Sequence, residues 1–295
     1  MTLLTSEDVR RLDRLSVAGR RIAPLPDWQG GRTARMRGLG TEFHDFRPYH
    51  PGDDPRAIDW NIHARLRQLV VRVPSADAHL AVHLLVDTSA SMGLGSPSKL
   101  AVALRVAAAL AYTALAGRDA VAVSTFDARV QPLAPSGLGP AQGRRITEAL
   151  ATLHASGASS AGQALGAYAG AVRGPGLAIV ISDFLDGDGP DAGLRALRRS
   201  GLTAGAVRIT DREEERIALD GEVELIDSEA PDQTLLVDAN AIAFYRRQLD
   251  EVGRRVADQC AQAGAPYLEV HTADSFTDVL QACVGSGLLE QRGSA

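Results

Sequence analysis

Short apolar segments alternate with helix-like patterns along most of this chain. Runs such as 80–86 and 177–182 are apolar and too short for helices, which is typical of buried strands. The segments between them place apolar residues at helical spacing, and the Ala- and Leu-rich stretch 99–116 predicts a buried helix. The predicted strands are 69–73, 80–86, 120–126, 177–182, 203–209 and 266–270, and the predicted helices are 99–116, 141–154, 161–172, 189–199, 239–263 and 274–284.

This order of elements predicts an α/β fold. Strands that alternate with helices form parallel pairs, because a crossover helix returns the chain to the starting edge of the sheet. We therefore expect a doubly wound, mostly parallel sheet with helices on both faces. Segments 222–227 and 233–237 flank the turn-forming residues 229–232, which predicts a β-hairpin inserted into this fold.

The first quarter of the chain follows a different pattern. Residues 6–24 fit an amphipathic helix with Ser6 as its cap. Residues 28–60 hold both tryptophans together with Gly, Pro and many charges, without periodicity, and predict a structured loop. The predicted divisions are an N-terminal extension over 1–77, an α/β domain over 78–286 and a tail over 287–295.

Composition narrows the class of protein. Hydrophobic residues make up 45% of the 295 positions and charged residues 23%, as in folded globular proteins. A net charge of −5 provides no overall basic field, so nucleic acid is not an expected partner. The two cysteines, Cys260 and Cys283, lie in predicted helices, and the N-terminus lacks an apolar leader segment. We expect a cytoplasmic protein without a membrane-spanning segment.

The loop after the strand at 80–86 carries the most informative chemistry. Asp87, Ser89 and Ser91 form a D-x-S-x-S pattern directly at the strand end, before a Gly-containing turn. Oxygen ligands of this kind suit Mg²⁺ or Mn²⁺, which keep several waters and take few protein carboxylates. Asp183, after another strand, and Ser159, in a hydroxyl-bearing loop, are expected at the same edge of the sheet, where ligands bind in such folds.

This pattern resembles the metal-ion-dependent adhesion site of von Willebrand factor A domains. That site combines D-x-S-x-S with a Thr from a later loop and an Asp after the fourth strand. The resemblance implies that Ser89 and Ser91 bind the ion directly and that Asp87 and Asp183 hold its waters. Ser159 stands where the family usually has Thr, and it lacks the methyl group that restricts the Thr rotamer.

The segment before the sheet resembles the bacterial family called "domain of unknown function 58". Its motifs E-F, R-x-Y, P-G-D-D, R-x-I-D-W and A-R all occur here between positions 42 and 65. The resemblance implies a von Willebrand A-like domain and a MoxR-type AAA+ ATPase as partner. The charged and aromatic residues assigned to partner binding or to structure are Glu42, Arg47, Tyr49, Asp53, Asp54, Arg56, Asp59, Trp60 and Arg65.

Each candidate also has a purely structural interpretation. Asp87 and the serines after it suit helix caps and turns, and the signature segment suits a loop held by Arg–carboxylate pairs and buried rings. His44, His50 and His63 lack the spacing of a zinc site. The stretch that ends at Lys99 departs from the phosphate-binding pattern G-x-x-x-x-G-K-[ST], because Ser98 precedes the lysine.

Two functional hypotheses follow. The first is a non-catalytic adaptor, in which the metal ion accepts a carboxylate from a partner protein and no residue of the chain is catalytic. The second is a metal-dependent hydrolase, in which Asp53, Asp54 or Asp59 acts as the base toward a metal-bound water. Serine hydroxyls are weak donors and a lone Mg²⁺ lowers the pKa of water poorly, so the adaptor is favoured.

Overall fold

The structure is a computed structural model of the chain. It describes residues 3–18, 45–50, 53–55, 58–73, 79–172, 174–185, 191–212, 223–226, 234–237 and 239–292. The chain divides into two compact units, of which the first joins residues 1–24 to residues 80–295 and the second comprises residues 25–79.

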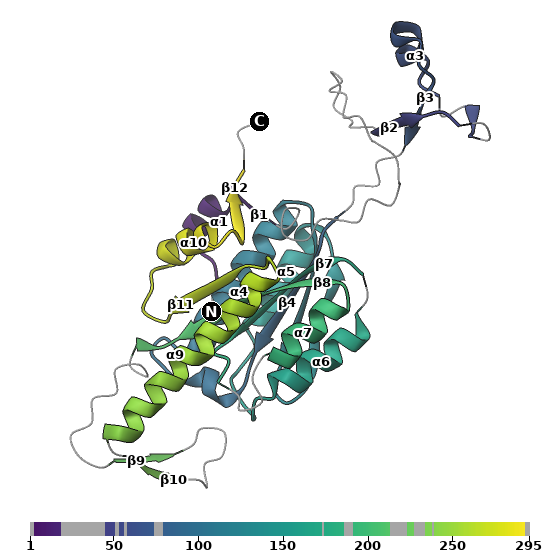
Figure 1. Ribbon diagram of the computed structural model, residues 1–295. Coiled ribbons are helices and arrows are strands. Elements are labelled where there is room, and N and C mark those ends of the chain that lie inside the picture. The colour runs from purple at the N-terminus through teal and green to yellow at the C-terminus, as the bar shows by residue number, and fades with distance from the viewer. Residues whose placement is uncertain are drawn as a thin grey trace. The chain divides into compact units, whose positions relative to one another are not determined.

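The first unit is built on a six-stranded sheet with the strand order β11-β8-β7-β4-β5-β6 (Figure 1). Neighbouring strands run parallel except for β6, which pairs antiparallel with β5 at one edge. The strands are β4 (Ala81–Asp87), β5 (Ala120–Phe126), β6 (Val130–Gly137), β7 (Gly176–Ser182), β8 (Leu202–Thr210) and β11 (Tyr267–His271).

Helices cover both faces of this sheet and form two separate cores (Figure 1). The first face carries α1 (Ser6–Leu12), α4 (Lys99–Ala116), α5 (Gly139–Leu150) and α10 (Phe276–Gly285). The second face carries α6 (Ala161–Ala171), α7 (Asp191–Arg199) and α9 (Ala239–Gln262). Because side chains of a strand alternate between faces, Leu84 of β4 joins the first core and Leu85 the second.

The topology reverses direction at β4. The chain passes from β4 through α4 to β5 on one side, and later returns to place β7 on the other side of β4. The carboxyl end of β4 is thus the switch point of the sheet, which is where open α/β sheets bind ligands. The predicted doubly wound, mostly parallel α/β fold is confirmed, and α4 and β5 have the predicted bounds.

Helix α4 is the most tightly enclosed helix of the first core. Its length and apolar composition would suffice to cross a membrane, but 67% of it is buried inside the fold. It contacts four strands of the sheet: β4, β5, β7 and β8. Packing against the sheet therefore accounts for its apolar sequence.

The two ends of the described chain depart from the prediction. Helix α1 ends at Leu12, not near residue 24, and its cap is Thr5, whose hydroxyl accepts a hydrogen bond from the amide of Asp8. The chain then forms β1 (Leu15–Val17), which pairs antiparallel with β12 (Leu289–Gln291). The described residues 3–18 thus belong to the sheet unit rather than to the following segment, and the predicted tail contains a strand. Three-residue strands are too short for an alternating pattern to show.

The second unit holds part of the segment predicted as a loop. Strands β2 (Asp45–Pro48) and β3 (Val70–Val73) pair antiparallel, and helix α3 (Trp60–Leu66) lies between them in sequence.

In the first unit, β9 (Val223–Ile226) and β10 (Thr234–Val237) form the predicted antiparallel pair, while the turn predicted at 229–232 lies outside the described residues. Strand β6 was not predicted, because two prolines and polar residues mask its pattern.

Two glycines provide a matched test of close packing in this fold. A Cβ atom on Gly205 of β8 would lie 2.7 Å from the carbonyl oxygen of Pro266, whereas one on Gly170 of α6 would meet nothing within 4 Å. We expect Gly205→Ala to lower the free energy of unfolding by about 1–3 kcal/mol through overpacking. We expect Gly170→Ala to raise it by about 0.5–1 kcal/mol. Urea denaturation of both variants measures the difference, and equal midpoints would contradict it.

Candidate functional site

Two buried carboxylates meet at the switch point of the sheet. Asp87 is the last residue of β4, and Asp183 follows the last residue of β7. Because β4 and β7 are neighbouring parallel strands, their carboxyl ends lie at the same edge. Asp87 is fully buried and Asp183 is 3% exposed, so both charges are withdrawn from bulk water. The predicted convergence of these two residues is what the structure shows.

The D-x-S-x-S loop brings two hydroxyl groups together beside Asp87. The Ser89 amide donates a hydrogen bond to Asp87 Oδ1 at 2.9 Å, which turns the loop back on the strand end. The 3₁₀ turn Ala90–Gly93 then carries Ser91, whose Oγ lies 3.1 Å from Ser89 Oγ. Two adjacent ligands of an octahedral Mg²⁺, each at about 2.1 Å, would lie about 3.0 Å apart. The two hydroxyl groups are within hydrogen-bond distance of each other, and this separation also equals the spacing of two ligands of one ion.

The loop that contains Ser159 is bonded to this turn through the backbone. The Ala90 amide donates to the Gly157 carbonyl oxygen, and the Ser156 amide donates to the Thr88 carbonyl oxygen, both at 2.8 Å. Gly157 has a φ of +81°, which favours glycine at this position. Three loops thus meet at one edge, as predicted, and Ser159 is half-buried among them.

Ser182 orients the Asp87 carboxylate, a role that the sequence did not reveal. Its hydroxyl donates to Asp87 Oδ2 at 2.6 Å and accepts from the Phe184 amide at 2.9 Å. Phe184 adopts a left-handed φ of +59°, which costs a non-glycine residue about 1–3 kcal/mol, and its ring is buried in the second core. Packing of this ring offsets the local strain and fixes the backbone between Asp183 and the following loop.

Lys99 supplies a positive charge inside the site. It is the first residue of α4, its side chain is fully buried, and its Nζ donates to Asp183 Oδ2 at 2.7 Å. Asp183 Oδ1 accepts a further hydrogen bond from the Leu185 amide. In the sequence, Lys99 stands out only as the end of an incomplete phosphate-binding pattern. Its place on the buried face of an apolar helix, four residues before the buried Ala103, was the signal of its role.

The charges of this cluster alter the acidity of Asp87. Burial, and then repulsion from the Asp183 carboxylate, raise the pKa of Asp87 from 3.8 to about 7. Hydrogen bonds from Ser182 and Ser89 oppose that rise. An ion with two positive charges at this edge would stabilise both carboxylates, since opposite charge within a few ångströms favours the ionised form.

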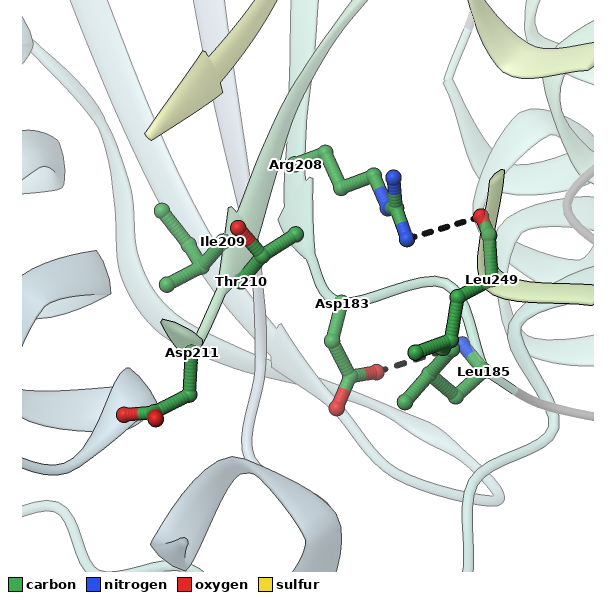
Figure 2. A pocket seen from close by; sticks show the side chains of 7 residues that line it. All are labelled: Asp183, Leu185, Arg208, Ile209, Thr210, Asp211 and Leu249. Carbon is green, nitrogen blue, oxygen red and sulfur yellow. Dashed lines mark hydrogen bonds between the residues drawn. The ribbon is translucent and has the colours of Figure 1, made fainter. Parts of the chain in front are cut away.

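A narrow cavity adjoins Asp183 near the carboxyl ends of β7 and β8. Figure 2 shows Asp183, Arg208 and Leu249 among the residues that line it. Its volume of about 10 Å³ leaves room for about one water molecule. Arg208 donates to Glu269 at 3.1 Å and to the Leu249 carbonyl oxygen at 2.9 Å, while its buried Nε lacks a hydrogen-bond partner. The cavity is far smaller than a site for an organic ligand.

The donor set fits a hard divalent cation. Two neutral hydroxyl oxygens stand next to two carboxylates, which is the mixture of oxygen ligands that Mg²⁺ or Mn²⁺ accepts with retained waters. In the part of the chain that the structure describes, His, Cys, Asp and Glu residues form no cluster of three or more. Such a site would hold an ion for binding an additional oxygen ligand, and it lacks the ligands of a zinc or two-metal centre.

The signature residues have mostly local structural contacts. Asp59 is buried and caps α3, accepting hydrogen bonds from the Asn61 and Ile62 amides, and Asp53 accepts from the His50 amide. The Tyr49 amide donates to the Leu69 carbonyl oxygen, and Arg47 lies in β2 opposite Val71 of β3. In α3, Trp60 is 59% exposed and Arg65 is exposed, as is Asp54 in the preceding turn. Glu42 and Arg56 lie outside the described residues.

Comparison with known proteins identifies the family. A family model described as "Protein of unknown function DUF58" matches residues 45–258. The chain belongs to the DUF58 family. Two uncharacterized proteins, Rv1480 of Mycobacterium tuberculosis and Mb1516 of Mycobacterium bovis, are each 29% identical over 269 residues. In both cases the match covers 85% of this chain and 81% of the relative.

Solved structures similar to this DUF58 protein include von Willebrand A-type proteins. BatB from Bacteroides thetaiotaomicron matches 70% of this chain and 98% of its own, with 14% identity and a TM-score of 0.42. A von Willebrand factor type A protein from Catenulispora acidiphila matches 63% of this chain and 44% of its own, with 20% identity and a TM-score of 0.36.

The raised pKa of Asp87 predicts a pH dependence of stability in the absence of divalent ions. As pH rises from about 4 to about 7, the unfolded chain releases the Asp87 proton before the folded protein does, so stability falls. We expect the free energy of unfolding to fall over this pH range by about 2–4 kcal/mol less in Asp87→Asn than in the wild type. Urea unfolding in EDTA at several pH values measures it. Parallel curves for the wild type and the variant would contradict the prediction.

Proposed function

We propose that this DUF58 protein is a non-catalytic, metal-dependent protein-interaction module. In this proposal Ser89 and Ser91 bind Mg²⁺ or Mn²⁺ directly, Asp87 and Asp183 hold its waters, and Ser159 completes the site. The ion keeps one position for a carboxylate oxygen of a partner protein. The observation that carries the proposal is the 3.1 Å separation of the two serine hydroxyls beside two buried carboxylates.

The ligand set favours binding over catalysis. Hydroxyl ligands are neutral, and a single Mg²⁺ with few carboxylates lowers the pKa of bound water less than a zinc or two-metal site does. Two carboxylates considered as bases, Asp53 and Asp59, already accept hydrogen bonds from nearby backbone amides. These contacts support a structural role for both residues in the second unit.

We further propose a MoxR-type AAA+ ATPase as the partner, with the pair acting in the cytoplasm to assemble or activate other proteins. The support is the resemblance of the signature segment to sequences associated with such ATPases. The sequence of this chain contains no G-x-x-x-x-G-K-[ST] nucleotide loop, so the energy of ATP hydrolysis would come from the partner.

Metal binding is tested by a pair of serine-to-alanine changes with a matched control. We expect Ser89→Ala combined with Ser91→Ala to weaken Mn²⁺ and Mg²⁺ binding at least about tenfold in titration calorimetry. Ser98→Ala removes a hydroxyl from the same loop, where it caps α4, and is expected to leave the affinity unchanged. Equal affinities in all three proteins would place the ion elsewhere.

Partner binding is tested with the same three proteins. A purified MoxR-type ATPase from the same organism should be retained by the wild type and by Ser98→Ala, and released by EDTA or by the double variant. Retention of the ATPase in the presence of EDTA would show that the interaction does not require the metal ion. Hydrolytic activity that depends on the metal and is lost in Asp54→Asn would favour the hydrolase hypothesis instead.

A further inference from the structure

Phe184 combines a backbone that suits glycine with a side chain that is buried. Its φ of +59° lies in the left-handed region, which is a clear outlier for a bulky residue. Its side chain is 1% exposed and belongs to the second core, together with Leu165 of α6, Leu194 of α7 and Val256 of α9. Glycine would adopt this φ without steric cost, but it has no ring to bury. The ring therefore holds a conformation that the backbone alone does not favour.

The turn at Phe184 is bonded to both acids at this edge of the sheet. The Leu185 amide donates a hydrogen bond to Asp183 Oδ1 at 3.2 Å (Figure 2). The Phe184 amide donates to Ser182 Oγ at 2.9 Å. A backbone amide can only donate, so the hydroxyl proton of Ser182 is left to donate to Asp87 Oδ2, 2.6 Å away. One turn thus orients one carboxylate directly and the other through a hydroxyl group.

Filling the core does not by itself explain this backbone. Phe126 is also buried in the second core, and it lies in an ordinary strand. The other left-handed residues of the described chain that are not glycine, Arg67 and Arg118, are exposed and follow the ends of helices. At Phe184 the φ angle sets the direction of the Leu185 amide relative to the preceding amide. It therefore decides whether both amides reach their acceptors.

We infer that Phe184 is a positioning residue for the proposed metal site. Burial of its ring in the second core holds the left-handed turn, and the turn holds Asp183 and, through Ser182, Asp87 in their observed orientations. This inference rests on the proposed metal site and adds a dependence of metal affinity on this turn. Ligands that are oriented before the ion arrives bind it more tightly, because less ordering has to accompany binding.

The test separates the ring from the backbone by comparing Phe184→Ala with Phe184→Gly. Both variants lose the buried ring, so both are expected to be less stable than the wild type. Alanine keeps the steric cost of a left-handed φ, whereas glycine does not. We expect Phe184→Ala to bind Mn²⁺ about tenfold more weakly than the wild type, and Phe184→Gly to bind within about threefold of it. Titration calorimetry measures the affinities at a temperature where circular dichroism shows the variants folded.

Leu194→Ala is the matched control for loss of core packing. It removes a buried side chain of α7 from the same core and involves no left-handed residue. We expect it to lower stability and to leave the Mn²⁺ affinity unchanged. Equal Mn²⁺ affinities in Phe184→Ala and Phe184→Gly would assign Phe184 to core packing alone and would overturn the inference.

Ser182→Ala tests the path from the turn to Asp87, and it decides the inference if Phe184→Ala fails to fold. The change removes the hydroxyl group between the Phe184 amide and Asp87 and leaves the ring in place. We expect the Mn²⁺ affinity to fall about tenfold. Ser124→Ala is the control, because it removes a buried hydroxyl group that is hydrogen-bonded to Tyr168, and it should bind Mn²⁺ as the wild type does. Wild-type affinity in Ser182→Ala would show that the turn does not act on the site.

The outcomes separate the inference from the proposed function. Absence of Mn²⁺ binding in the wild type overturns the proposed metal site and the inference with it. Binding that is lost in the Ser89 and Ser91 double variant, but equal in Phe184→Ala and Phe184→Gly or unchanged in Ser182→Ala, keeps the site and overturns the inference. Affinity that is weakened in Phe184→Ala and Ser182→Ala, and restored in Phe184→Gly, supports both.

Discussion

The burial of two carboxylates at the ends of neighbouring parallel strands is the constraint on which this structure depends. Charged groups inside a protein are stable only when hydrogen bonds and opposite charges replace the water that they lose. Asp87 receives the Ser89 amide and the Ser182 hydroxyl, and Asp183 receives the Leu185 amide and the Lys99 ammonium. The loop, the end of β7 and the start of α4 are thus held in place by the same pair of acids.

Apolar packing and polar chemistry are separated along the same strands. Within β4 and β7 the apolar side chains fill the two cores by alternation, and the buried carboxylates lie where the strands end. His83, inside β4, is an exception that is hydrogen-bonded to Tyr168. The left-handed backbone of Phe184 and the buried charges of Asp87 and Asp183 are concentrated at this edge. Strain and buried charge at one site are common where function, not stability, has shaped the local structure.

Much of the fold was predictable because its signal is repeated and local. The apolar runs of β4, β5, β7 and β8 and the helical pattern of α4 predicted the layered α/β architecture, and strand order then placed Asp87 near Asp183. The short β1 and β12 were missed because three residues carry no period, and β6 because its prolines conceal an edge strand.

The candidate site was only partly predictable. D-x-S-x-S is a local pattern, whereas the roles of Lys99 and Ser182 depend on side chains that pack against residues about ninety positions away. A lysine on the buried face of an apolar helix signals a hidden acidic partner, but the sequence does not say which one. The sequence also leaves open whether Asp59 is a base or a helix cap. The hydrogen bonds that Asp59 accepts from the Asn61 and Ile62 amides identify it as a cap.

Pairing of β1 with β12 joins segments that are more than 270 positions apart, with Leu15 opposite Gln291 and Val17 opposite Leu289. During synthesis on the ribosome, β1 is therefore made about 270 residues before its partner strand. Residues 25–79 emerge in that interval, between two segments that belong to the sheet unit. Pairing of β1 with β12 consequently comes after synthesis of the six-stranded sheet, and a chain interrupted before residue 289 leaves β1 without its partner strand.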